Sequence, residues 1–99
     1  MAREVVWSHR ALEDRKRILR YWVSRNKSNT YSRKLNRLIK AAIKLIAERP
    51  HIGRPTDLPN VRVKIVRDYL IIYEVMESKL HIHSIWEGRQ DPKKIGLPR

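Results

Sequence analysis

The chain has 99 residues, 41% of them apolar, no cysteine and a formal net charge of +13. This length suits one domain, residues 1–99, with a small core. The missing cysteines exclude a disulfide framework and a thiolate metal site. The N-terminus has no apolar leader-like segment and no apolar run reaches about 18 residues, so we expect a cytoplasmic protein with no membrane partner.

The beginning of the chain predicts a short strand and then a helix. Residues 4–8 are the strand candidate. Ser8 can cap the helix, because a serine hydroxyl accepts a hydrogen bond from a free amide of the first turn. Apolar residues at helical spacing predict that this helix runs to about Arg25.

A second helix is predicted from about Thr30 to Glu48, after a polar break at residues 26–30. Its apolar residues recur every three or four positions, and Pro50 ends it. The short link implies an antiparallel helical hairpin. Four cations step by four, three and four along this helix and form one basic stripe: Arg33, Arg37, Lys40 and Lys44. The stripe is either a solvated face or a contact surface.

The positive charge is concentrated in this helical half. Residues 8–50 hold 13 Lys and Arg against three acidic residues, or +10, and residues 51–99 hold nine against six, or +3. Such a surface attracts polyanions or an acidic protein.

Residues 61–90 predict three antiparallel strands after a Gly- and Pro-containing loop at residues 51–60. Residues 61–66 alternate in polarity, and residues 69–75 are apolar almost throughout, as in a central strand. In the third strand, Leu80, Ile82, Ser84 and Trp86 alternate with His81, His83 and Ile85. The order β-α-α-β-β-β predicts an α+β domain, a helical hairpin packed on a small antiparallel sheet with residues 4–8 at one edge. A basic tail is expected from about residue 91.

Two groups of side chains are candidates for chemistry. His81 and His83 share a strand face, which suits an acid–base role or, more simply, a partly buried polar pair. The sequence places no third ligand beside them, so we expect no metal site and no cofactor. The second group is cationic and can bind or stabilise phosphate, or be solvated. It comprises Arg62, Lys64, Arg67 and Arg89.

Taken together, these segments resemble the RelE/ParE superfamily of bacterial type II toxins. The resemblance is carried by the helix end Glu48-Arg49-Pro50, the loop Gly53-Arg54-Pro55, the strand Tyr69-Leu-Ile-Ile-Tyr73 and the closing Ile85-Trp-Glu-Gly-Arg-Gln-Asp-Pro92. It implies a toxin neutralised by an antitoxin encoded beside it. RelE-like members cut mRNA on the ribosome, and ParE-like members act on DNA gyrase.

The departures from the nuclease pattern favour the ParE-like branch. Leu70 stands where the resemblance implies an arginine, and no tyrosine follows Tyr73. We therefore expect a gyrase inhibitor that is not an enzyme. The alternatives are a ribosome-dependent mRNA endonuclease and a non-toxic basic nucleic-acid-binding domain. A nuclease would use Arg62, Lys64, His81, His83 and Arg89.

The expected partner is an acidic, ParD- or RelB-like antitoxin that folds on binding and forms a hetero-oligomer with this chain. Operator DNA would be bound through the antitoxin. The residues predicted to contact the antitoxin or the target are Arg33, Arg37, Lys40, Lys44, Arg62, Lys64, Arg67, Arg89, Lys93 and Lys94.

Overall fold

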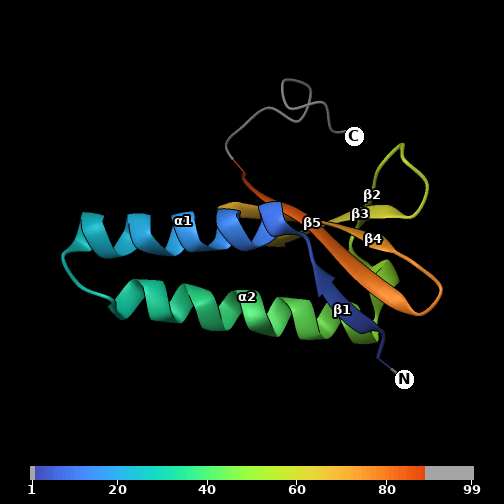
Figure 1. Cartoon of the computed structure of the whole chain (residues 1–99), viewed down its shortest axis with the longest axis horizontal. Coiled ribbons are helices and arrows are strands. Elements are labelled where there is room, and N and C mark those ends of the chain that lie inside the picture. The colour runs from blue at the N-terminus through green and yellow to red at the C-terminus, as the bar shows by residue number, and fades with distance from the viewer. Residues whose placement is uncertain (1, 89–99) are drawn as a thin grey trace.

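Two antiparallel helices pack against a five-stranded sheet in the computed structural model, which describes residues 2–88 (Figure 1). The elements are β1 (Glu4–Trp7), α1 (His9–Asn26), α2 (Thr30–Glu48), the 3-10 turn η1 (Pro50–Ile52), β2 (Arg54–Pro55), β3 (Val61–Val66), β4 (Tyr69–Val75) and β5 (Lys79–Glu87). The predicted α+β class and the helical hairpin are confirmed.

The strand order across the sheet is β1-β5-β4-β3-β2. The three central strands are antiparallel, as predicted. β1 lies at the predicted edge but runs parallel to β5, so the sheet is mixed. β2 falls inside the loop predicted for residues 51–60 and pairs only with Arg62 and Val63. It ends in proline, which a sheet accepts at an edge because the ring nitrogen cannot donate to a neighbour.

The predicted helix boundaries have visible causes. The Ser8 hydroxyl oxygen accepts from the backbone N–H of Ala11 at 2.9 Å and caps α1. α1 ends before Lys27, whose φ of 54° is left-handed. α2 ends at Glu48, and Pro50 starts the 3-10 turn.

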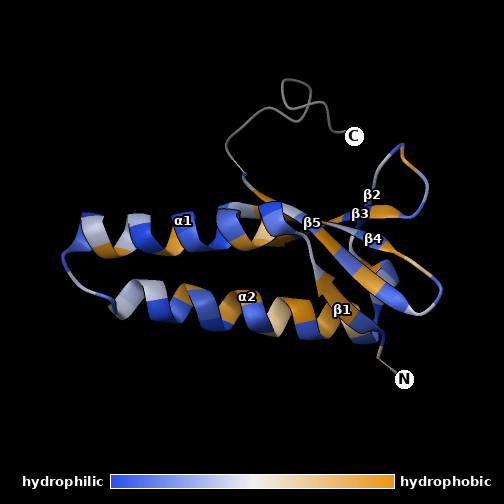
Figure 2. Cartoon of the chain, in the orientation of Figure 1, coloured by the Kyte–Doolittle hydropathy of each residue, from blue (hydrophilic) through white to orange (hydrophobic). Residues whose placement is uncertain are grey.

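The core lies between the hairpin and one face of the sheet. Apolar residues recur along both helices and alternate with polar residues along β5 (Figure 2). The largest fully buried side chains are Tyr73, Leu35, Ile39, Ile46, Ile71, Leu80, Ile82 and Ile85. These come from α2, β4 and β5.

A bulge in β5 changes the predicted alternation. Ile72 pairs with Ser84, whereas Tyr73 pairs with Ile82, so His83 is an extra residue on β5. A bulge shifts the residues beyond it to the opposite face. The alternation predicted for this strand is therefore wrong after Ile82, because Ile85 continues the core face in place of Ser84.

The first turns of α1 complete the edge of β5 where β1 stops. The Ser8 hydroxyl donates to the backbone carbonyl of His83 at 2.7 Å. Oδ2 of Asp14, a side chain only 6% exposed, accepts from the backbone N–H of Ile85 at 3.0 Å. These two contacts satisfy backbone groups of β5 beyond the end of β1 and hold α1 against the sheet.

Candidate functional site

The sheet separates the two groups of candidate nuclease residues. Arg62 pairs with Tyr73 across the strands, and Tyr73 is fully buried toward the helices. His81 pairs with Glu74, on the opposite face. Because paired residues on neighbouring strands share a face, Arg62 and Lys64 lie on the helix side and the two histidines on the other side. They do not meet in one site.

The Arg62 guanidinium supports the loop between α2 and β3. Its Nη1 donates to the backbone carbonyls of His51 at 3.0 Å and Gly53 at 2.7 Å. The Tyr73 hydroxyl lies beside this contact. It donates to the carbonyl of Pro50 at 2.7 Å and accepts from the N–H of Gly53 at 3.0 Å. Burial raises the pKa of Tyr73, although the Gly53 hydrogen bond and the Arg62 charge both lower it.

The histidines lie beside a carboxylate that sequence reasoning missed. Nε2 of His83 is 2.8 Å from Oε1 of Glu74, and the His81 and His83 rings are 5.8 Å apart. Glu74 can be recognised as a partner of the histidines once the pairing of β4 with β5 is known, because this pairing places Glu74 opposite His81. Within residues 2–88, no group of three or more His, Cys, Asp or Glu side chains is arranged to hold a metal ion.

A groove of about 290 Å³ runs between α2 and β3. Its lining from the helix is Leu38, Ala41, Ala42 and Leu45, and its lining from the strand and the following turn is residues 64–67. Leu45 is 38% exposed, a large fraction for a leucine on the apolar side of a helix. Beyond Val63, β2 no longer covers β3, so among the described strands this part of β3 is a free sheet edge.

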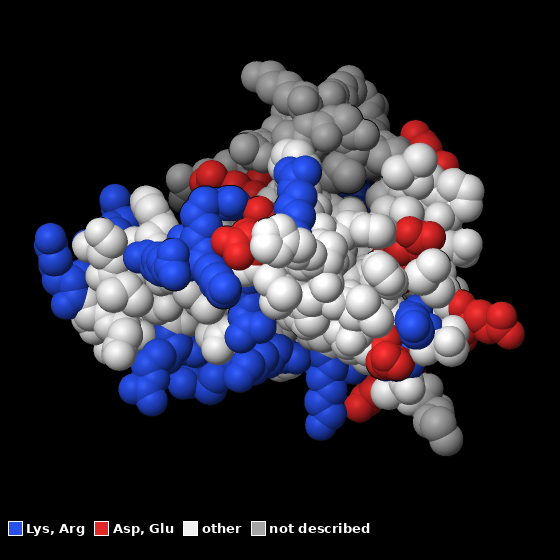
Figure 3. Space-filling model, in the orientation of Figure 1, with Lys and Arg blue, Asp and Glu red and all other residues white. Residues whose placement is uncertain are grey.

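Cations line the strand side of the groove, and further cations are exposed elsewhere on α2. Lys64 and Arg67 line its strand side. The predicted basic stripe on α2 is exposed along its whole length, although none of its residues lines the groove. Lys and Arg side chains gather over the two helices in Figure 3. Among the described residues that line the groove, none is acidic, so the groove has an apolar floor and cations on its strand side. The predicted contact residues Arg89, Lys93 and Lys94 lie outside the described residues.

The fold is that of a known class of toxin. The structure titled "Chromosomal ParDE TA system from P. aeruginosa" matches with a TM-score of 0.73 and 19% identity, over 87% of this chain and 96% of that one. The model of the ParE toxin family of type II toxin-antitoxin systems, parDE, matches residues 5–92, and the chain belongs to this family. No curated protein matches it. No helix within residues 2–88 is long and apolar enough to cross a membrane.

Proposed function

We propose that this toxin inhibits DNA gyrase by protein contact, does not cleave mRNA, and is neutralised by an acidic antitoxin. The observation that carries the proposal is the separation of the candidate nuclease residues by the sheet. A nuclease needs its charges gathered around one phosphate. Here Arg62 is occupied by two loop carbonyls, and the histidines lie on the far face. Leu70 supplies no charge to either group.

The groove between α2 and β3 supports the choice of an acidic, amphipathic antitoxin segment as its occupant. Apolar side chains of such a segment would cover Leu38 and Leu45, and its carboxylates would face the cations of α2 and β3. The free edge of β3 adds backbone groups that an extended segment can pair with. A segment that is disordered alone would bury its apolar residues only on this surface. Operator DNA would then be bound through the antitoxin.

The target is tested by induced expression in a bacterium, with plasmid supercoiling and in-cell mRNA cleavage measured together. We expect growth arrest, relaxed plasmid and intact mRNA. Purified protein should also block supercoiling by purified gyrase. Arrest with cut mRNA would contradict the gyrase target and favour the ribosome. Harmless expression with salt-sensitive binding to nucleic acid would instead favour a non-toxic binding domain.

The antitoxin surface is tested with the protein encoded by the neighbouring reading frame. Leu45→Asp places a charge on the groove floor and should weaken antitoxin binding at least tenfold. Leu12→Asp is the matched control, because Leu12 is 39% exposed and lies on α1, away from the groove. Arg37→Glu should slow association more than Arg20→Glu does, because Arg37 belongs to the basic stripe on α2. Equal effects of Leu45→Asp and Leu12→Asp would rule out the groove as the docking site.

A further inference from the structure

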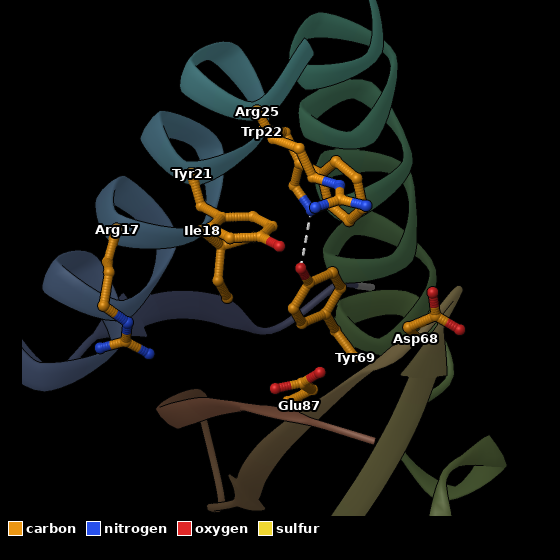
Figure 4. A pocket seen from close by; sticks show the side chains of 8 residues that line it. All are labelled: Arg17, Ile18, Tyr21, Trp22, Arg25, Asp68, Tyr69 and Glu87. Atoms are coloured by element: carbon orange, nitrogen blue, oxygen red, sulfur yellow. Dashed lines mark hydrogen bonds between the residues drawn. The ribbon is translucent and has the colours of Figure 1, made fainter. Parts of the chain in front are cut away.

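A second hollow, of about 450 Å³, lies where α1 passes the end of the sheet. It belongs neither to the antitoxin groove nor to the histidine pair. α1 contributes Arg17, Ile18, Tyr21, Trp22 and Arg25, and the opposite wall is formed by Asp68 in the β3–β4 turn, Tyr69 of β4 and Glu87 of β5 (Figure 4). Its volume is within the range of small-molecule sites, about 300–1,000 Å³.

Aromatic rings form one wall of this hollow. Nε1 of Trp22 donates to the Tyr69 hydroxyl at 2.7 Å, which fixes both rings (Figure 4). Tyr21 meets Trp22 edge to face, with centroids 5.2 Å apart. Tyr69 is buried, and burial raises its pKa despite the hydrogen bond from Trp22. Tyr21 is 52% exposed, whereas Trp22 is only partly exposed, so the Tyr21 ring is the most accessible of the three to a ligand.

Charged groups of both signs surround these rings. Arg17 and Arg25 line the hollow from α1, Asp68 lines it from the β3–β4 turn, and Glu87 lines it from β5 (Figure 4). The ion pairs formed within residues 2–88 include Arg17 with Asp14 at 3.0 Å, but none involves Arg25, Asp68 or Glu87. The N–H of Gly88 bonds to the carbonyl of Asp68, which keeps the two carboxylate-bearing segments together.

A ligand that uses all these groups needs three properties. It needs a flat face for Tyr21, hydrogen-bond donors for the carboxylates and a negative charge for the arginines. An acidic peptide would leave the carboxylates opposed by like charge. A cationic side chain would meet the arginines and a chain of net charge +13. A nucleotide has all three properties, because its base stacks, its base edge donates and its phosphate is anionic.

We propose that this hollow binds a nucleotide, with guanine preferred, either free or within single-stranded nucleic acid. Guanine is preferred because its edge carries adjacent N–H donors, which one carboxylate accepts together. Tyr21 stacks on the base, Glu87 or Asp68 reads its edge, and Arg25 contacts the phosphate. The site does not depend on gyrase inhibition or on antitoxin binding.

The test is titration calorimetry of the whole chain with GMP, with CMP and with a single-stranded oligonucleotide that carries one guanosine. Tyr21→Ala should raise the Kd for GMP about tenfold, as expected for the loss of one stacking contact. Glu87→Gln should reduce the preference for GMP over CMP. Arg25→Gln should weaken both nucleotides equally and make binding less sensitive to salt.

Two controls remove the same charges elsewhere. The control variants are Arg20→Gln and Glu77→Gln. Arg20 lies on α1 and Glu77 lies in the turn between β4 and β5, and neither residue lines the hollow. Both should bind GMP like the unmodified chain, and circular dichroism should show that every variant is folded. Dependence of GMP binding on Tyr21 supports a free nucleotide as ligand. If GMP does not bind but binding of the oligonucleotide depends on Tyr21, the ligand is single-stranded nucleic acid.

Three results would overturn the proposal. The first is that neither GMP nor the oligonucleotide binds at millimolar concentration. The second is that Arg20→Gln weakens binding as much as Arg25→Gln, which would mean diffuse attraction to the basic surface. The third is that an arginine amide binds in place of GMP and depends on Glu87, which would assign the hollow to a cation.

Discussion

Replacing Gly53 by alanine should destabilise the chain through a steric conflict with the core. The backbone of Gly53, at φ −69° and ψ 159°, suits any residue, so the effect comes from space and not from conformation. An added Cβ would overlap the Tyr73 hydroxyl oxygen and lie 2.8 Å from Cε1 and Cζ of the same ring. The ring is fully buried and cannot swing into solvent.

The expected loss of stability can be estimated from the interactions of Tyr73 that the new methyl group disrupts. Overpacking a buried site costs about 1–3 kcal/mol. Displacing the hydroxyl breaks its bonds with Pro50 and Gly53, and each buried polar group left without a partner costs about 1–3 kcal/mol. Three polar groups lose a partner, namely the Tyr73 hydroxyl, the Pro50 carbonyl and the Gly53 N–H, so even the lower ends of these ranges give a loss of about 4 kcal/mol. That is a large share of the roughly 5–15 kcal/mol that stabilises a typical domain.

The assay is urea unfolding followed by circular dichroism and tryptophan fluorescence, as a double-mutant cycle with Tyr73→Phe. Phenylalanine lacks the oxygen that the new Cβ would overlap. Gly53→Ala should therefore cost at least about 1 kcal/mol less in the Tyr73→Phe background. Additive effects would refute the steric reasoning, and so would a Gly53→Ala variant as stable as the unmodified chain.

Two further predictions concern buried polar groups. Asp14→Ala should lower the unfolding free energy by about 2 kcal/mol, because the N–H of Ile85 loses its acceptor. Asp14→Asn should restore part of this loss. The control Glu13→Ala, at an exposed neighbouring residue, should change the unfolding free energy by less than about 0.5 kcal/mol. Burial raises the pKa of Tyr69 and Tyr73, so the native state keeps protons that the unfolded chain releases. The contribution of these two tyrosines to the unfolding free energy should be constant below about pH 10 and fall as the pH rises further. Thermal melts against pH should show this fall, and Tyr73→Phe should make it shallower.

Much of the local structure was predictable because its causes are local. The capping hydroxyl of Ser8, the helical spacing of apolar residues and the stop at Pro50 all act within a few residues. The strand β4 was predictable for a related reason, since its apolar run needs cover on both faces. The basic stripe on α2 was equally predictable, because helical geometry alone places these four residues on one side of the helix.

The candidate site was less predictable, because it depends on which segments meet. Sequence spacing grouped Arg62 with the histidines of β5. Strand register assigns them to opposite faces, and a bulge at His83 shifts every residue after it. Neither property is contained in a strand's own residues, since register and bulges are settled by the packing of paired strands.

What the sequence by itself determined is the α+β class, the hairpin, the order of the main elements and the concentration of charge on the helices. These follow from periodicity, caps and composition. Only the tertiary structure decided that β1 joins β5 in parallel, that α2 and β3 enclose an apolar groove, and that Glu87 comes to lie across a hollow from Tyr21. The physical reason is that such contacts join residues far apart in the chain, and the free energy that selects them belongs to the whole core.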